Sequence, residues 1–175
     1  MIFRILSKKD ITDSVILLNQ YLSFGLAKKE SLERHIGNNS ALVCEVDGKV
    51  VGFALALQIE KIEEELLNHH DMISKLPFDK ELSIFKQIVV DKGYRNKGIA
   101  DKLVKSIISR LQNRRIFALA WKKPVDYCIE RILVNNGFKE IMIKEFFWYE
   151  DSLLNNYGCP YCGGACKCPA VLFLK

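Results

Sequence analysis

An α/β fold with about seven strands is what this 175-residue sequence predicts. Apolar, β-rich segments alternate with amphipathic segments along the chain. Asp47-Gly48 separates two apolar runs, which is the strongest short-range signal of a β-hairpin. A further apolar strand, residues 84–90, runs into a polar turn and then an amphipathic helix, as in a strand–turn–helix unit.

The individual elements follow from the same patterns. Residues 2–7 form the first predicted strand. Asp10 or Thr12 caps a helix that reaches about Leu22. The later predicted elements are a helix at 28–36, hairpin strands within 40–60, an acidic insert at 60–80 whose helix ends at Pro77, a strand to Val90, a helix at 98–112, a strand ending near Trp121, a helix from Pro124 to Asn136, a long strand at 138–150 and a short strand at 170–174.

Length and composition indicate one globular domain over residues 1–175, in which 155–170 is a cysteine-rich loop between the last two strands. The chain is 49% apolar and 27% charged, as in soluble proteins. It contains no apolar run long enough to cross a bilayer, and its start does not resemble a signal peptide. We therefore expect a cytoplasmic protein without a membrane partner. The net charge of +5 is too mild to argue for nucleic acid.

The segment around Arg95, Gly98 and Ala100 has the features of an anion site. The first N–H groups of a helix lack internal partners, and the helix dipole adds positive charge there. A glycine lets a phosphate approach the backbone closely. The spacing fits neither a dinucleotide fingerprint nor a P-loop. An ordinary strand–turn–helix connection that happens to carry a glycine is the alternative.

The spacing Arg95-x-x-Gly98-x-Ala100 resembles the acetyl-CoA-binding motif of the GCN5-related N-acetyltransferases, the GNAT superfamily. Gly137-Phe138 resembles the late glycine–phenylalanine motif of that family, where a helix ends and the sixth strand begins. The resemblance covers residues 2–150 and the last strand. It implies an α+β mixed sheet of about seven strands with helices on both faces.

The resemblance also implies where the co-substrate acetyl-CoA binds. In this family the fourth and fifth strands splay apart and the pantetheine arm pairs with the fourth strand, here at Ile88, Val89 and Val90. The pyrophosphate lies on the following turn and helix start, which here comprise Arg95, Asn96, Lys97, Gly98, Ile99 and Ala100.

The implied reaction is direct attack of an amine on the thioester, which needs a base, an oxyanion donor and an acid. Backbone N–H near Val90 suits the oxyanion. Glu81 is the predicted base; a surface role capping the insert, or a base from 63–65, stays open. Leu133 stands where many members have a tyrosine that acts as the acid, and Asp126 stands where an asparagine is common. We group both with the cofactor-binding positions.

Four cysteines lie close together near the end of the chain: Cys159, Cys162, Cys166 and Cys168. Their Cys-Pro-x-Cys-Gly start is typical of a zinc knuckle, and four thiolates suit tetrahedral zinc. Reduced thiols, a disulfide or an iron–sulfur centre are the alternatives. A zinc-bound loop here would act as a wall of the acceptor pocket or as a simple structural staple.

The leading hypothesis is therefore an acetyl-CoA-dependent N-acetyltransferase whose acceptor is a small-molecule or peptide amine. The alternative is a non-catalytic module that senses acyl-CoA or binds a partner through the zinc knuckle. Only Lys167 and Lys175 lie near the cysteines, which argues against nucleic acid. Assembly as a homodimer is open.

Overall fold

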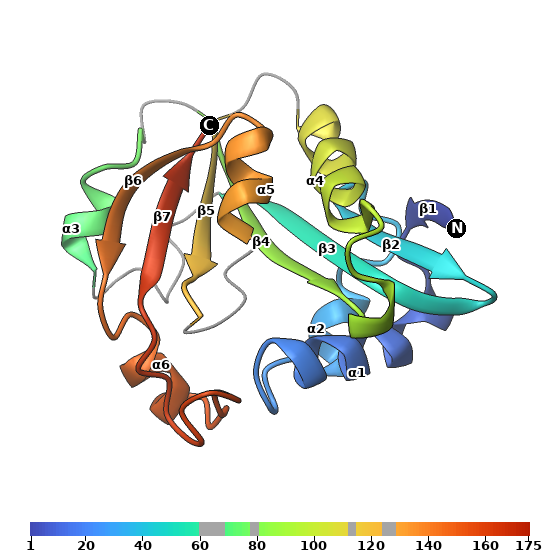
Figure 1. Cartoon of the computed structure of the whole chain (residues 1–175), viewed down its shortest axis with the longest axis horizontal. Helices are drawn as coiled ribbons and strands as arrows, with labels where there is room; N and C mark the ends of the chain where they lie inside the picture. Colours follow the sequence, from blue (N-terminus) through green and yellow to red (C-terminus); the bar gives the residue numbers. More distant parts are fainter. Residues whose placement is uncertain (60–68, 78–80, 112–114, 124–128) are drawn as a thin grey trace.

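A computed structural model describes residues 1–59, 69–77, 81–111, 115–123 and 129–175. Its strands form one seven-stranded sheet in the order β1-β2-β3-β4-β5-β7-β6 (Figure 1). Among the described strands, β4 and β5 pair in parallel and all other neighbours are antiparallel. The strands are β1 (Ile2–Ile5), β2 (Ala41–Val46), β3 (Lys49–Ile59), β4 (Leu82–Val90), β5 (Arg115–Trp121), β6 (Lys139–Lys144) and β7 (Ala170–Leu174).

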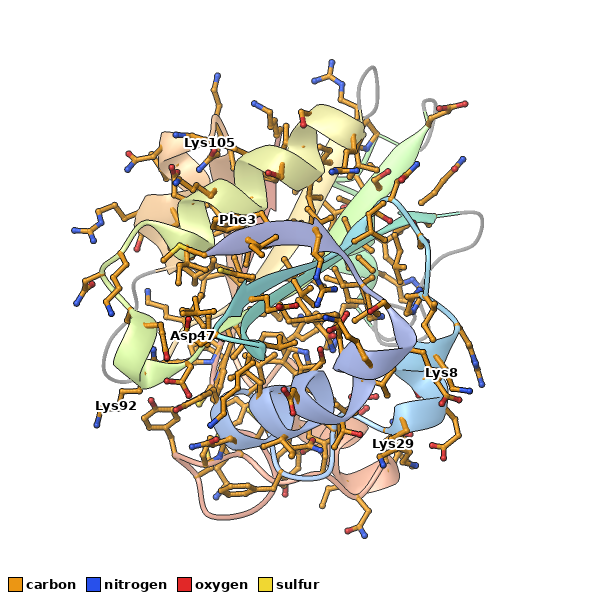
Figure 2. All side chains as sticks on the ribbon, turned by 90° about the vertical axis from the view of Figure 1, so that its right-hand side faces the viewer. Phe3, Lys8, Lys29, Asp47, Lys92 and Lys105 are labelled. Carbon is orange, nitrogen blue, oxygen red and sulfur yellow. The ribbon has the colours of Figure 1, made fainter. Side chains whose placement is uncertain are left out.

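Helices cover both faces of this sheet, which confirms the predicted architecture. Helix α4 lies on one face and helices α1 and α2 lie on the other (Figure 2). No helix in the described ranges combines the length and the apolar character that crossing a bilayer requires. The helices are α1 (Ile11–Tyr21), α2 (Lys29–Glu33), α3 (His70–Ile73), α4 (Ile99–Arg110), α5 (Ile129–Asn135) and α6 (Tyr149–Leu154), with 3-10 turns η1 (Lys8–Asp10) and η3 (Lys92–Tyr94).

The hairpin expected at Asp47-Gly48 is confirmed between β2 and β3. Val46 pairs with Lys49, and both turn residues have positive φ, 49° for Asp47 and 79° for Gly48. A two-residue turn with positive φ at both positions matches the twist of the flanking strands. The local sequence therefore sets the register of this pair.

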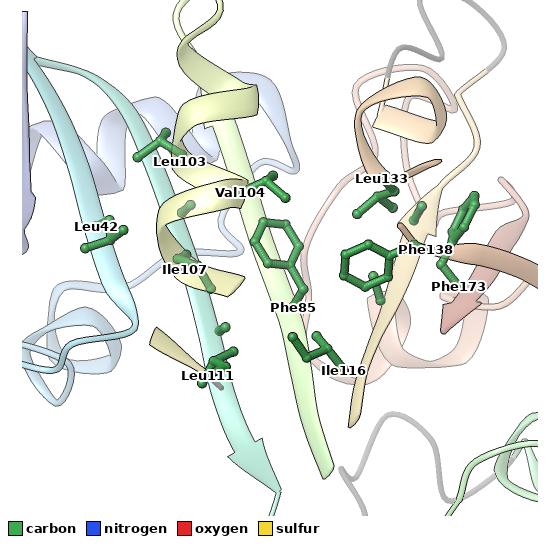
Figure 3. Packing of buried hydrophobic residues seen from close by; sticks show 14 of the residues in the cluster. Leu42, Phe85, Leu103, Val104, Ile107, Leu111, Ile116, Leu133, Phe138 and Phe173 are labelled. Carbon is green, nitrogen blue, oxygen red and sulfur yellow. The ribbon is translucent and has the colours of Figure 1, made fainter. Parts of the chain in front are cut away.

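Helix α4 is held against the sheet by an apolar stripe. Leu103, Val104 and Ile107 are buried and face Leu42 of β2 and Phe85 of β4 (Figure 3). Gly52 of β3 lets the start of the helix approach closely, because a Cβ there would lie 2.9 Å from Ile99 Cγ2. The core thereby fixes the N-terminus of α4 beside the end of β4.

The long strand predicted at 138–150 is wrong in its second half. Strand β6 ends at Lys144, and a turn leads into α6 at Tyr149. Phe146 adopts a left-handed backbone with φ of 54°, which breaks the strand. Phe147 is buried next to Met72 and Leu172, so the apolar run serves the core rather than a strand.

Other boundaries also differ from the predictions. Helix α2 is shorter than the predicted helix at 28–36. Residues 60–68 of the acidic insert lie outside the described residues, and its described part contains only the short α3. Cys44 is fully buried in the core, as expected for a small apolar residue.

Arg4 of β1 is expected to stabilise the fold through a buried carboxylate. Its guanidinium binds Asp10 at 2.6 and 2.7 Å and also contacts Glu45. Burial raises the pKa of Asp10, but hydrogen bonds from Arg4 and Ser7 outweigh it and leave that pKa below its usual value. Arg4→Ala should cost about 2–3 kcal/mol at neutral pH, because it leaves a buried carboxylate without its partner.

The pH dependence gives this prediction its sign. A carboxylate with a depressed pKa in the folded state contributes stability above its unfolded pKa, and this is lost as the pH falls through the folded pKa. The difference between wild type and Arg4→Ala in urea unfolding should therefore shrink below about pH 4. Lys9→Ala, which removes an exposed contact to Glu45, should change stability by less than about 0.5 kcal/mol. A pH-independent loss for Arg4→Ala would contradict this account.

Candidate functional site at the split in the sheet

The sheet splits between β4 and β5. Their parallel ladder pairs 82–85 with 115–118, whereas β4 continues to Val90 and β5 to Trp121. Beyond the ladder the two strands diverge (Figure 1). A cavity of about 640 Å³, lined by both strands, lies in this split. That volume suits a cofactor or a small substrate.

Two walls enclose the cavity, one on each face of the sheet. The α4 wall consists of the turn and start of α4 together with α5, and includes Arg95, Asn96, Gly98, Ile99, Ala100, Asp101, Ile129, Arg131, Ile132, Leu133 and Asn135. The loop wall consists of the end of α1, the chain after it, and α6 with the loop that follows. It includes Tyr21, Leu22, Ser23, Leu26, Trp148, Tyr157 and Cys166.

The turn between β4 and α4 is fixed by its own hydrogen bonds. Asp91 Oδ1 accepts from Gly93 N–H at 2.8 Å, and Arg95 Nε donates to the Val90 carbonyl at 3.2 Å. Asn96 and Gly98 both have positive φ, 61° and 74°. Glycine adopts this conformation without a Cβ penalty, and here it leads the chain directly into the helix.

The start of α4 leaves backbone donors without helical partners. Gly98 is its N-cap, and its carbonyl accepts from Lys102 N–H at 3.0 Å, the first turn of the helix. The N–H groups of Ile99, Ala100 and Asp101 precede that first bond. Together with the helix dipole, these groups would favour an anion at this end of the cavity.

The end of β4 also offers backbone groups to the cavity. Asp91 N–H donates to the Val51 carbonyl of β3 at 2.9 Å. Backbone groups of successive strand residues point to opposite sides, so Val90 N–H and the backbone of Ile88 point away from β3. They point into the split, where β5 no longer pairs with β4.

Most of the residues predicted to bind the cofactor come together at this cavity, whereas Lys97 and the predicted base, Glu81, do not. Lys97 is not in its wall, and its Nζ lies 4.9 Å from the ring centre of Tyr94. Glu81 is not in the wall either. It precedes β4 at the end that is paired with β5, where its carbonyl accepts from Arg115 N–H. Asp126 lies outside the described residues, as do residues 63–65. The predicted residues in the wall are Ile88, Val89, Val90, Arg95, Asn96, Gly98, Ile99, Ala100 and Leu133.

The loop wall contains functional groups that sequence reasoning missed. Tyr157 is largely buried, and its hydroxyl donates to Asp151 Oδ2 at 2.5 Å. Trp148 lies in the turn before α6, which the sequence analysis assigned to a strand. Nothing in the sequence predicted the contact between Asp151 and Tyr157, because that contact depends on helix α6, which the sequence analysis did not predict.

The two loops that form this wall are joined by backbone hydrogen bonds. Phe24 N–H donates to the Gly158 carbonyl at 2.9 Å, and Gly158 N–H donates back to Phe24 at 3.0 Å. Phe24 follows α1, whereas Gly158 immediately precedes Cys159. The chain after α1 and the cysteine loop therefore form one continuous surface.

The cysteine cluster lies behind this surface. The Sγ atoms of Cys159, Cys162 and Cys168 lie within 4.8 Å of one another. Cys166 is not in this set, but it is buried in the same cluster, next to Trp121 and Trp148, and lines the cavity. The predicted four-cysteine site is thus gathered in one place, with three sulfurs in closer mutual contact.

These thiols have different acidities. A hydrogen bond from Lys167 N–H lowers the pKa of Cys162. Burial raises the pKa of Cys168 to about 11, and burial also raises the pKa of Cys166. Cys162 therefore ionises more readily than Cys166 or Cys168, whose thiolates a nearby cation would stabilise.

Comparison with known proteins agrees with this geometry. A model of the acetyltransferase (GNAT) family matches residues 15–126, which is more than half of the chain. The chain therefore belongs to the GNAT acetyltransferase family. No curated protein gives a significant sequence match.

Solved structures of N-acetyltransferases share the fold over almost the whole chain. Ribosomal-protein-alanine N-acetyltransferase from Brucella melitensis is 15% identical with a TM-score of 0.67, and covers 100% of this chain and 99% of its own. Arabidopsis thaliana NAA60 in complex with acetyl-CoA is 15% identical with a TM-score of 0.69, covering 99% and 97%. Diaminobutyrate acetyltransferase EctA from Paenibacillus lautus, with its substrate and coenzyme A, is 14% identical with a TM-score of 0.64, covering 98% and 93%.

Asn136 is expected to hold the two helices of the α4 wall together. Its buried side-chain amide donates to Asp101 Oδ1 at 2.9 Å and to the Ile132 carbonyl at 2.8 Å. Asn136→Ala should lower the free energy of unfolding by about 1–2 kcal/mol, because two hydrogen bonds donated by this buried amide are lost. Chemical denaturation measures this loss.

The neighbouring Asn135→Ala is the matched control. Asn135 is exposed at the end of α5, so its removal should change stability by less than about 0.5 kcal/mol. Equal effects of the two substitutions would contradict the structural role given to Asn136.

Proposed function

We propose that this protein is an acetyl-CoA-dependent N-acetyltransferase that transfers an acetyl group to an amine by direct attack. The observation that carries the proposal is the split between β4 and β5, whose cavity joins an anion-binding helix start on one face to an aromatic wall on the other. Membership of the GNAT family supports the same reaction class.

The α4 wall suits the donor. The pyrophosphate would accept hydrogen bonds from N–H groups at the start of α4, beside Gly98. The pantetheine amides would pair with the backbone of Ile88 and Val90, which faces the split. Leu133 is fully buried in this wall, so it would contribute apolar contact and no proton.

The loop wall suits the acceptor. Its aromatic side chains, Tyr21, Trp148 and Tyr157, offer apolar contact and π-faces to a primary amine. In the reaction the amine nitrogen forms a bond to the thioester carbon and the carbon–sulfur bond breaks. The ammonium must first lose a proton, and the CoA thiolate must gain one. Val90 N–H is the proposed oxyanion donor.

Tyr157 is the proposed proton-transfer residue in place of Glu81. It belongs to the loop wall, and its hydroxyl is hydrogen-bonded to a carboxylate, Asp151. Tyr157→Phe should lower kcat by about 100-fold while leaving acetyl-CoA affinity unchanged. Tyr161→Phe, an exposed tyrosine of the same loop, is the matched control and should keep its activity.

A non-catalytic acyl-CoA-binding module is the second candidate, and Leu133 favours it. Many family members have a tyrosine at that position. Both candidates bind acetyl-CoA, and only the enzyme releases CoA when amines are supplied. A panel of a polyamine, free amino acids and a peptide with a free N-terminus separates them by mass spectrometry of acetylated products.

Acetyl-CoA binding itself is tested with two matched glycine variants. Gly98 and Gly48 have positive φ, 74° and 79°, and a Cβ at either would meet nothing within 4 Å. Gly98→Ala and Gly48→Ala should therefore cost similar stability. Only Gly98→Ala should weaken acetyl-CoA binding, by about tenfold or more, because its Cβ occupies the space a phosphate needs. Calorimetric titration measures both; equal affinities for the two variants would contradict the proposal.

A zinc ion at the cysteine cluster is the second non-protein component of the proposed enzyme. The chemistry of the donor set supports it, since clustered thiolates at the Cys-Pro-x-Cys-Gly turn suit zinc. One zinc per chain is expected by elemental analysis of the purified protein.

A further inference from the structure

The spacing of the cysteine sulfurs matches a zinc–thiolate site. Cys168 Sγ lies 3.9 Å from Cys159 Sγ and 3.7 Å from Cys162 Sγ. Sulfurs bound to one tetrahedral zinc at about 2.3 Å lie about 3.8 Å apart. A disulfide would require a separation of about 2.0 Å. Three thiols are thus already arranged as one face of a metal site.

The backbone around the first two cysteines supports this arrangement. Gly163 N–H donates to the Cys159 carbonyl at 3.0 Å, which closes the turn between the two cysteines. Lys167 N–H donates to Cys162 Sγ at 3.4 Å. Such N–H···S bonds stabilise a thiolate that binds a metal. Hydrogen bonds from the backbone therefore close this turn by themselves.

A buried indole adds an independent observation. Trp121 at the end of β5 packs on the cluster, and its buried Nε1 has no hydrogen-bond acceptor of normal geometry in the described part of the chain. It lies next to the Cys168 thiol. A metal-bound thiolate at Cys168 would supply the missing acceptor, whereas a neutral thiol is a weak one.

Cys166 completes the donor set from the cavity side. Its side chain is buried next to Cys159 in the same cluster. Its N–H donates to Ser152 Oγ of α6 at 2.9 Å, which anchors this part of the loop. Movement of its sulfur towards the other three would give the four thiolates of a closed structural site.

We propose that a zinc ion bound by Cys159, Cys162, Cys166 and Cys168 holds the loop wall in place, so that loss of the metal opens the acceptor side of the cavity. The name acceptor side rests on the proposed function, whereas the metal site does not. The ion would shape the cavity and would not take part in the chemistry.

The connections of the cluster support this role. Cys159 follows Gly158, which is bonded to Phe24 in the chain after α1. Cys168 precedes Pro169, whose carbonyl accepts from Lys122 N–H beyond β5 at 3.0 Å. The ion would therefore link the chain after α1 to the end of β5 and the start of β7.

Apolar packing around the cysteines is limited in the part of the chain that the structure describes. The local apolar cluster consists of Cys159, Cys166 and Cys168 themselves, packed by Trp121 and Trp148. Unbound thiols form only weak hydrogen bonds. Metal binding is therefore expected to supply much of the order of the loop, as it does in small zinc-bound segments.

The test measures metal content and hydrogen exchange on the full chain, with native metal and after chelation. One zinc per chain is expected. Chelation should speed exchange at the Phe24 and Gly158 amides by about tenfold or more, because each is protected only by the other loop. Amides of α4, such as those of Leu103 and Ile107, should be unchanged, and so should calorimetric binding of acetyl-CoA.

A matched pair of variants controls for loss of a cysteine. Cys162→Ala removes an exposed ligand and should reproduce the effect of chelation, with zinc lost. Cys44→Ala removes a buried thiol of the main core and should retain the zinc and the slow exchange at Phe24 and Gly158. Restoring zinc to the chelated wild type should restore that protection.

Three outcomes would overturn the proposal. They are a protein that neither carries nor takes up zinc, zinc loss that leaves Phe24 and Gly158 exchange unchanged, and zinc loss that speeds exchange throughout α4 as well. If Cys166→Ala bound zinc with full affinity, Cys166 would not be the fourth ligand. None of these depends on turnover, so failure of the acetyltransferase proposal would be seen separately as absent acetyl-CoA binding.

Discussion

The short parallel ladder between β4 and β5 is the constraint on which the candidate site depends. It ends at Phe85 and Ala118 although both strands continue. From that point β4 pairs with β3 alone, and the backbone of Ile88 and Val90 N–H face the split. A sheet that stayed paired would leave no cavity and no free strand backbone. The interruption of the sheet therefore creates the opening and supplies the hydrogen-bonding groups that line it.

Each wall of the cavity has its own physical character because each is built from a different face of the sheet. The α4 wall presents backbone N–H groups and a helix dipole, which favour an anion. The loop wall presents aromatic rings, a tyrosine paired with Asp151, and a cysteine. The apolar stripe of α4 and the close approach at Gly52 fix the first wall through the main core. The second wall has mainly the Phe24–Gly158 bonds and the cysteine cluster to fix it.

Local sequence patterns predicted correctly those features that adjacent residues determine, such as a turn or the buried face of a helix. Asp47-Gly48 determines a turn by its own backbone preferences, and the stripe on α4 determines its buried face. The prediction of a strand through 138–150 was wrong because an apolar run occurs both in strands and in buried turns. Only the packing of Phe147 against Met72 and Leu172 decides between them.

By itself the sequence determined the turn that leads into α4, since Arg95, Gly98 and Ala100 are neighbours whose spacing sets the local backbone. It also determined the cysteine cluster, whose members lie within ten positions. Tertiary structure alone decided that Glu81 stays outside the cavity, that Tyr157 meets Asp151 in its wall, and that Gly158 pairs with Phe24. These are relations between segments brought together by the sheet order and by helix α6, and no local spacing encodes a distance between such segments.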